Sequence, residues 1–404
     1  MSGMRCGSGA RGGDKTTFWR VSELFMTEFQ ISSNLIFGAG STDALGRYCK
    51  KNVTVITDAV MKETGICDRI VNLLRTCNVS VYDKVMPDPT LTLVTDCLKF
   101  VTDKGAEVIV ALGGGSAIDT AKAVILVLDG MNVHPEFVAI PTTSGTGSEV
   151  TNYTVIRDED AGRKIPLADD RMIPDLAILD YKLTKTVPPK VTAFTGMDVI
   201  THAFEAYVAK GANPITDAYA EKALKLAFEW LPEAYKNGDD DAARENMMMA
   251  SYLAGLAFTK AGLGICHSIS HAVGAAFHIP HGEANAITLP HVIAFNSALN
   301  VPFGADKSPT AKRYAEIARI IGLPAAGTRL SVQYLVREIN KLNNELQIPS
   351  SLLQAGVNLP NYTEHRGRII QAALEDICTT ANPVAPDAGQ IGAVLDRVFG
   401  KILP

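Results

Sequence analysis

The strand pattern of this chain stops near its middle. Up to residue 187, short apolar segments rich in valine and isoleucine alternate with helical segments, an order typical of βαβ units around a parallel sheet. After Val187-Pro188-Pro189 the chain is rich in Ala, Leu, Glu and Lys at helical spacing, without a convincing strand. We therefore predict an α/β domain over residues 29–188 and an all-helical domain over residues 189–404. A length of 404 residues suits two such cores.

The individual elements follow from the same periodicity. Buried strands are predicted at 53–57, 79–82, 107–112 and 137–140, and a hairpin extension with one more strand between 153 and 180. Helices are predicted at 62–77, at 90–104 and from residue 117. In the second half they are predicted near 190–209, 214–235, 241–259, 263–277, 283–299, 310–321, 327–345, 364–378 and 386–399.

Histidines in the second half recur at helical spacing. Asp198 and His202 are four residues apart, as are His267 and His271, so each pair shares one face of a helix. Five of the eight histidines fall within 25 residues: His267, His271, His278, His281 and His291. Any one of them alone is better explained as a capping or core-edge histidine. Imidazoles with a carboxylate at repeated spacing favour a site for a divalent first-row metal such as Fe(II) or Zn(II).

A glycine-rich turn, Gly113-Gly114-Gly115-Ser116, lies between a predicted strand and helix. Glycines let backbone N–H groups approach a phosphate, and a helix N-terminus adds partial positive charge. The turn lacks the third glycine of GxGxxG, because Ile118 stands there, and a plain βα turn would look the same. The hydroxyl-rich segment 141–146 follows another strand, at the sheet edge where ligands bind in open α/β folds.

Asp58 follows directly after the strand at 53–57. A carboxylate there can accept hydrogen bonds from a ribose 2′-OH and repels a 2′-phosphate, which favours NAD over NADP. It can also cap the next helix, and the two uses are compatible.

Composition excludes several classes of protein. A net charge of −5 and an isoelectric point near 5.9 argue against a nucleic-acid-binding protein, which would carry an excess of basic residues. Seven scattered cysteines without a CxxC pair indicate free thiols in a reducing cytoplasm. No apolar run reaches the roughly 18 residues of a membrane span, and residues 1–15 are too rich in Gly and Ser for a secretory signal. We expect a cytoplasmic enzyme without a membrane partner.

Residues 1–28 form an N-terminal extension whose first part reads as disordered. Phe18, Val21, Phe25 and Phe29 then recur at helical spacing. This segment is either a helix docked on the body of the protein or a docking peptide for a groove of a partner or shell protein.

Four motifs together carry a resemblance. GGGSAID at 113–119, PTTSGTGSE at 141–149, GMDVITH at 196–202 and the histidines of 267–281 look like the iron-dependent (group III) alcohol dehydrogenase family. The similarity runs from about residue 31 to the C-terminus. Within the family, the chain most resembles the 1-propanol dehydrogenases of propanediol utilisation and their ethanolamine-pathway relatives. The resemblance implies a dehydroquinate synthase-like architecture, with an α/β dinucleotide-binding domain and an all-helical metal-binding domain.

The resemblance also implies roles for individual residues. Asp198, His202, His267 and His281 match the family's metal ligands, and His271 matches its second, non-ligating histidine beside the substrate. Phe258 matches an aromatic residue of the substrate pocket. The positions that match the dinucleotide site are Asp58, Gly114, Gly115, Ser116, Asp119, Thr142, Thr143, Thr146, Val155, Lys164 and Leu183. The chain departs from the common pattern in its extension and at Asp88, where some members have Asn.

The implied activity is hydride transfer between NAD(H) and a short-chain primary alcohol or aldehyde, such as 1-propanol/propanal or ethanol/acetaldehyde, with Fe2+ or alternatively Zn2+. His271 is placed to relay the hydroxyl proton. We expect a homodimer, and the extension suggests a microcompartment shell or cargo protein as partner and the microcompartment lumen as location. Two alternatives remain. One is a lyase of the dehydroquinate-synthase type, whose metal site resembles a Glu and two His. The other is an added scaffold role.

Overall fold

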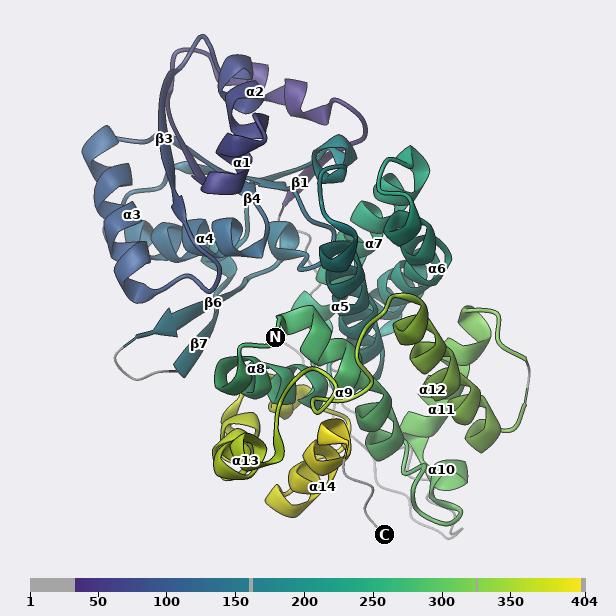
Figure 1. Cartoon of the computed structure of the whole chain (residues 1–404). Helices are drawn as coiled ribbons and strands as arrows, with labels where there is room; N and C mark the ends of the chain where they lie inside the picture. Colours follow the sequence, from purple (N-terminus) through teal and green to yellow (C-terminus); the bar gives the residue numbers. More distant parts are fainter. Residues whose placement is uncertain (1–32, 160–162, 325, 401–404) are drawn as a thin grey trace, which may run out of the picture. The chain divides into compact units, whose positions relative to one another are not determined.

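The computed structural model describes residues 33–159, 163–324 and 326–400. The predictions made for the extension at residues 1–28 lie outside this part of the chain. The first half of the described chain forms a six-stranded parallel sheet and a separate hairpin, and the second half is built of helices (Figure 1). The predicted fold class, an α/β domain followed by an all-helical domain, is confirmed. The domain limits at residues 29–188 and 189–404 stay predictions.

The parallel sheet has the strand order β1-β8-β5-β4-β2-β3. Its central strands are continuous apolar runs, as expected for a sheet covered on both faces. In β4, Ile109 and Ala111 pack against the helices at 91–104 and 115–130 on one face. Val108, Val110 and Leu112 belong to the core shared with the helices at 59–63 and 66–73 on the other. The strands span Asn34–Phe37 (β1), Asn52–Asp58 (β2), Asn78–Val85 (β3), Val108–Gly113 (β4), Glu136–Pro141 (β5) and Leu176–Leu179 (β8).

Apart from short 3-10 helices that were not predicted, the first half departs from the predictions in two places. The helix predicted at 62–77 is two helices, α1 (Ala59–Glu63) and α2 (Ile66–Leu73), because Gly65 between them has a left-handed backbone with φ 75°. Strand β1, which pairs with β8 at the sheet edge, was not predicted. The other elements agree with the prediction: α3 (Leu91–Lys104), α4 (Gly115–Gly130) and the antiparallel hairpin of β6 (Tyr153–Asp158) and β7 (Arg163–Ala168).

From Pro189 onward the described residues form helices and no strand. The predicted helices are found with three differences: α13 spans Leu359–Glu375 instead of 364–378, and the short α10 and the 3-10 helix η5 (Ile377–Ala381) were missed. Their bounds are Pro189–Val208 (α5), Pro214–Lys236 (α6), Asp241–Ala261 (α7), Ile265–Phe277 (α8), His281–Asn296 (α9), Gly304–Lys307 (α10), Pro309–Ile320 (α11), Thr328–Glu345 (α12), Leu359–Glu375 (α13) and Ala388–Phe399 (α14).

Helix α5 lies at the centre of this helical part. It contacts α6, α7, α9 and α11, and nearly its whole length from Thr192 is buried. A helix that is apolar on all sides belongs in a core, so the polar residues Asp198 and His202 on it are buried among neighbours. Among the described residues no single helix is long and apolar enough to cross a membrane, although the strongly bent pair α7 and α8 meets the criteria of length and composition together.

Candidate metal centre and dinucleotide site

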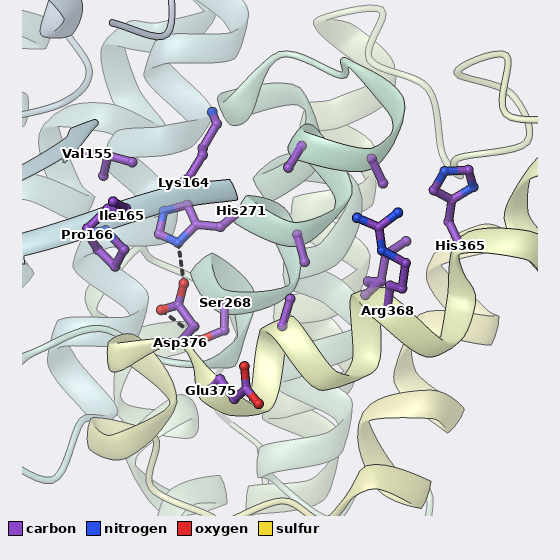
Figure 2. A pocket seen from close by; sticks show the side chains of 15 residues that line it. Val155, Lys164, Ile165, Pro166, Ser268, His271, His365, Arg368, Glu375 and Asp376 are labelled. Atoms are coloured by element: carbon purple, nitrogen blue, oxygen red, sulfur yellow. Dashed lines mark hydrogen bonds and ion pairs between the residues drawn. The ribbon is translucent and has the colours of Figure 1, made fainter. Parts of the chain in front are cut away.

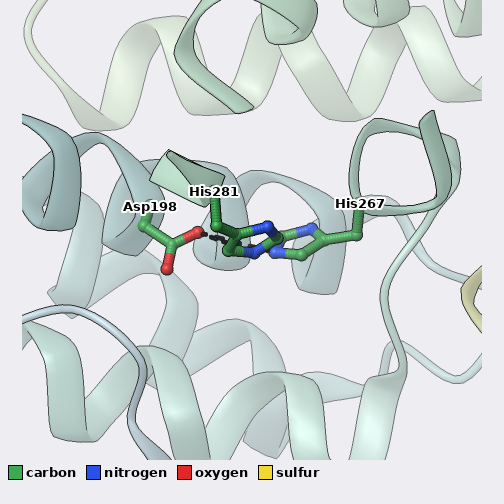
Figure 3. A group of neighbouring side chains, drawn as sticks. All are labelled: Asp198, His267 and His281. Atoms are coloured by element: carbon green, nitrogen blue, oxygen red, sulfur yellow. Dashed lines mark ion pairs between the residues drawn. The ribbon is translucent and has the colours of Figure 1, made fainter. Parts of the chain in front are cut away.

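Three of the four predicted metal ligands converge in the helical part. Donor atoms of Asp198, His267 and His281 all lie within 4.8 Å of one another (Figure 3). The Nε2 atoms of His267 and His281 are 3.7 and 3.5 Å from Oδ1 of Asp198. The three residues come from α5, α8 and α9, so tertiary packing of three helices assembles the group.

Local sequence explains how α9 brings His281 so close to α5. His281 is the first residue of α9, directly after Pro280. A Cβ atom on Gly282 would lie 2.1 Å from the carbonyl oxygen of Phe194 on α5, far inside contact distance. Only a glycine at 282 therefore lets the start of α9 rest against the backbone of α5.

His202, the fourth predicted ligand, lies beside this group. Its Nε2 is 3.9 Å from Oδ1 of Asp198, one helical turn away on α5. The His202 ring stacks on the rings of Phe258 and His267 at centroid distances of 4.5 and 4.6 Å. The structure thus brings all four predicted ligands to one place, with His202 slightly outside the tight group of three.

Two buried residues that the sequence analysis missed contact this group. Glu205, two turns after Asp198 on α5, has Oε2 2.6 Å from Nδ1 of His267 and accepts the Cys266 N–H through Oε1 at 2.7 Å. The Asn285 side-chain amide donates to Oδ1 of Asp198 at 2.7 Å and lies 3.2 Å from Nε2 of His267. The Glu205 contact assigns the proton of His267 to Nδ1 and turns Nε2 toward Asp198.

The electrostatics of the group suit a divalent cation. Burial alone would raise the pKa of Asp198, but His202, His281 and His267 together hold it well below its usual range. Burial lowers the pKa of His202 to about 4, so this imidazole is neutral. At His267, burial would lower the pKa, but Asp198 and Glu205 raise it to about 9. The ionised Asp198 and the neutral His202 are donors for Fe(II) or Zn(II). His267, whose protonated form the two carboxylates favour, loses a proton when its Nε2 binds a cation.

His271 stands next to the group and is held by a carboxylate. Its Nδ1 is 2.8 Å from Oδ2 of Asp376 (Figure 2). Its ring stacks on that of His281 at a centroid distance of 5.1 Å. Oδ1 of Asp376 accepts the Cys378 N–H at 2.9 Å. Burial, together with the nearby Asp376, raises the pKa of the Cys378 thiol well above its usual range, so a neutral thiol lies beside this pair.

The glycine-rich turn begins α4 and is packed tightly. Gly113 has φ 151°, and a Cβ there would lie 2.8 Å from Cβ of Ala117 and 3.2 Å from Oδ2 of Asp58. Gly114 caps α4 without a side-chain hydrogen bond, so the first N–H groups of the helix have no side-chain partner at that cap. Such a helix start, preceded by glycines, is able to bind a phosphate.

Other predicted dinucleotide residues surround this turn. Ideal Cβ positions on Gly114 and Gly115 would meet the side chains of Thr143 at 3.4 Å and Thr146 at 2.9 Å. The Thr142 N–H donates to the carbonyl of Gly113 at 3.0 Å. Asp58 caps α1 by accepting the Met61 N–H through Oδ1 at 3.0 Å, while Oδ2 is the atom near Gly113. The helix-capping role of Asp58 is therefore observed. Its position next to the turn is compatible with the predicted hydrogen bond to a ribose 2′-OH, which stays a prediction.

Asp119 connects the start of α4 with the β6–β7 hairpin, and Lys164 connects the hairpin with the segment before α3. The partly buried carboxylate of Asp119 accepts the Ser148 hydroxyl at 2.8 Å and the Val155 N–H at 3.2 Å. Lys164 on β7 donates to Asp88 at 2.6 Å. Asp119 thus holds the segment that carries Val155 beside the turn, and its contact with a cofactor stays a prediction.

A cavity of about 270 Å³ joins the turn to the metal-ligand group. Its lining includes many of the predicted residues: Gly115, Ser116, Asp119, Thr146, Val155, Lys164, Asp198, His202, Phe258, His267, His271 and His281. Asp58, Gly114, Thr142 and Thr143 lie outside this lining, near the turn. Leu183 lies apart, buried in the core of the α/β sheet. A second cavity of about 430 Å³ lies on the other side of His271, between the hairpin and α8 and α13 (Figure 2).

Comparison with known proteins identifies relatives along nearly the whole described chain. Residues 32–181 match the family model "Iron-containing alcohol dehydrogenase", and residues 192–399 match "Fe-containing alcohol dehydrogenase family, C-terminal". The chain is 40% identical to 1-propanol dehydrogenase PduQ of Salmonella typhimurium, over 93% of this chain and 100% of that protein. It is 36% identical to the NAD-dependent methanol dehydrogenase of Bacillus methanolicus, over 93% of this chain and 100% of that protein.

Solved structures give the same result. The iron-containing alcohol dehydrogenase of Thermococcus thioreducens superposes with a TM-score of 0.83 at 31% identity, over 93% of this chain and 100% of that one. A 1,3-propanediol oxidoreductase superposes with a TM-score of 0.84 at 31% identity, with the same coverage of both chains.

Proposed function

This chain belongs to the iron-containing alcohol dehydrogenase family, and from that premise we propose that it transfers a hydride between NAD(H) and a short-chain primary alcohol or aldehyde. The observation that carries the proposal is the single cavity that has the start of α4 on one side and Asp198, His202, His267 and His281 on the other. A cofactor whose phosphates bind at the turn can reach a substrate held at the histidines only through such a space. The family match favours this reaction over the lyase alternative.

We assign the metal to Asp198, His202, His267 and His281. When bound, the metal supplies Lewis acidity that lowers the pKa of an alcohol hydroxyl or polarises an aldehyde carbonyl. Glu205 keeps the His267 ring turned so that Nε2 faces the other ligands. Phe258, stacked on His202, covers this side of the cavity with an apolar ring and so limits the entry of water.

The remaining site residues bind the cofactor and move the proton. When bound, the dinucleotide supplies a nicotinamide that takes or gives the hydride. Backbone N–H groups at Gly115 and Ser116 bind its phosphates, and Lys164 and Val155 line its path to the histidines. His271, held through Nδ1 by Asp376, presents its other nitrogen for the hydroxyl proton of the substrate.

Turnover of short alcohols tests this proposal. Protein purified without oxygen and loaded with iron is assayed with NAD+ and 1-propanol, and with NADH and propanal, beside a series from methanol to butanol. We expect activity in both directions, with a preference among the short chains that the cavity admits. Metal-loaded protein without turnover of any alcohol or aldehyde would contradict the dehydrogenase and favour the lyase or scaffold role. Metal analysis of the protein as purified, before iron is added, decides between iron and zinc.

Asp58→Gly is expected to relax the preference for NAD. The substitution removes the carboxylate that would repel a 2′-phosphate, so the ratio of kcat/KM for NAD+ to that for NADP+ should fall. It also removes the cap of α1, which costs about 0.5–2 kcal/mol when the replacement is alanine and less with glycine. Asp58→Asn keeps the cap without the charge and is the matched variant. An unchanged cofactor ratio in both variants would show that Asp58 only caps the helix.

We further propose that residues 1–28 dock on the shell or on a co-packaged protein of a bacterial microcompartment. Support comes from the apolar spacing of Phe18 to Phe29, and from the family match, which begins at residue 32. We also propose a homodimer, with the cytoplasm or the microcompartment lumen as the location.

Deletion of residues 1–28 should leave kcat and the melting temperature nearly unchanged while abolishing co-purification with the partner. The physical reason is that the extension lies outside the segment that carries the catalytic motifs. A large fall in melting temperature would show that the segment packs on the body of the protein and would end the docking proposal.

A further inference from the structure

A second group of metal-binding side chains lies beside the first. Donor atoms of His271, Asp376 and Cys378 all lie within 4.8 Å of one another, and each residue offers a different element: nitrogen, oxygen and sulfur. The exposed fraction of the side chain is 16% for His271 and 8% for Asp376, and Cys378 is buried. None of the three belongs to the Asp198 group.

The chain holds these side chains in place through a short helical turn. Asp376 caps the 3-10 helix η5 (Ile377–Ala381), and this cap brings Cys378 next to the carboxylate. The turn is fixed to its surroundings by Thr379, whose hydroxyl lies 2.8 Å from the Ser268 hydroxyl on α8 and 2.7 Å from the carbonyl of Ala373. Oδ2 of Asp376 faces His271, which also comes from α8 (Figure 2). The three donors are therefore preorganised by two anchored elements.

An ion can reach this group from two sides. His271 and Asp376 line the cavity of about 430 Å³, and His271 and Cys378 line the cavity of about 270 Å³ that holds the proposed reaction. The group thus lies where the two cavities meet, and a cation bound there would contact the space that the substrate occupies.

The donor set selects the chemistry of the ion. A thiolate, an imidazole and a carboxylate suit a borderline to soft cation, and Zn2+ with three protein ligands keeps a fourth position for water. We propose that His271, Asp376 and Cys378 form a second, inhibitory Zn2+ site. On binding, the Cys378 thiol loses its proton to solvent, and the proton on Nδ1 of His271 moves to Nε2 so that Nδ1 coordinates the ion. The inhibition rests on the proposed function of His271, whereas the binding does not.

Cobalt distinguishes this site from the first without reference to activity. Co2+ bound by a thiolate gives a sulfur-to-metal charge-transfer absorption in the near ultraviolet, and none of the four proposed ligands of the first site is a cysteine. Iron-loaded, full-length protein is titrated with Co2+ without oxygen. We expect this absorption to saturate at one equivalent in the wild type and in Cys266→Ser, the control for the buried thiol beside His267. It should be absent from Cys378→Ser and weakened in Asp376→Asn, which keeps an oxygen to cap η5.

Zinc inhibition completes the test. Wild-type activity should fall on addition of Zn2+ and recover when a chelator removes the zinc. The iron content of the protein should stay constant through both changes. Cys378→Ser should need at least about 10-fold more zinc for the same fractional inhibition, since loss of even an indirect partner of a metal weakens binding by 10- to 100-fold. The proposal is overturned if the wild type shows no thiolate band, if the band persists in Cys378→Ser, or if inhibition follows the loss of iron. The cobalt absorption is measured without an activity assay, so its outcome is independent of whether the protein turns over alcohols.

Discussion

His267→Ala and Asp198→Ala should each abolish alcohol oxidation and release most of the bound metal while the fold persists. Each residue supplies one of the few donors that converge within 4.8 Å, and a site that loses a donor opens to water. Removal of an indirect partner already weakens metal binding by about 10- to 100-fold, so the loss of a direct ligand should exceed that range. Metal analysis and steady-state kinetics on anaerobically prepared protein measure both effects.

His291→Ala is the matched control for these variants. His291 lies on α9, ten residues after His281. It lines neither the cavity of about 270 Å³ nor the cavity of about 430 Å³. We expect its substitution to leave metal content and turnover close to wild type, and circular dichroism to show the same helical content in all three variants. Near-normal turnover by His267→Ala or Asp198→Ala with metal still bound would refute the ligand assignment.

Much of the fold could be read from the sequence because its signals are local. Val108, Val110 and Leu112 belong to an unbroken apolar run that ends in glycine, which is how a strand buried on both faces and followed by a tight turn must look. Helices α6 and α7 begin at the capping residues Asn213 and Asp240, which mark their starts in the sequence. Strand β1 escaped prediction because it has only four residues at the sheet edge, with side chains that are half-buried or exposed.

Without the family resemblance, the candidate site was predictable only where its residues are close in sequence. The pairs Asp198–His202 and His267–His271 share a helix face at four-residue spacing, and their convergence could be expected. Asn285 follows His281 by the same spacing, so this rule could also have found it. The contact of Asp376 with His271 joins residues 105 positions apart, and only the packing of η5 against α8 creates it.

Glu205 is the residue whose role depends most on tertiary structure. In the sequence it is one acidic residue of a long helix, seven positions after Asp198, and nothing near it marks a metal site. In the structure it is buried, and its two carboxylate oxygens accept from different parts of α8, Nδ1 of His267 and the N–H of Cys266. Each of these hydrogen bonds uses a separate acceptor oxygen, and a carboxylate has two such oxygens where an amide has one.

Glu205→Gln should therefore weaken metal binding by about 10- to 100-fold while leaving the direct ligands in place. A glutamine has one acceptor oxygen, so its NH2 group must face either the N–H of Cys266 or the protonated Nδ1 of His267. The ring then loses the contact that turns Nε2 toward Asp198, or α8 loses a buried hydrogen bond at a cost of about 1–3 kcal/mol. Competition with a chelator measures the metal affinity, and thermal unfolding of the metal-free protein measures the second effect separately.

Glu221→Gln provides the comparison for this variant. Glu221 accepts from the Tyr207 hydroxyl near the end of α5 at 3.4 Å and lies outside both cavities that contain His271, so its substitution should not change metal affinity. Glu205→Asp, which keeps both acceptors on a shorter side chain, should recover part of the loss. If Glu205→Gln binds metal as tightly as the wild type, the carboxylate stabilises only the packing of α8 on α5, and the orientation of His267 must come from Asn285 and the neighbouring rings.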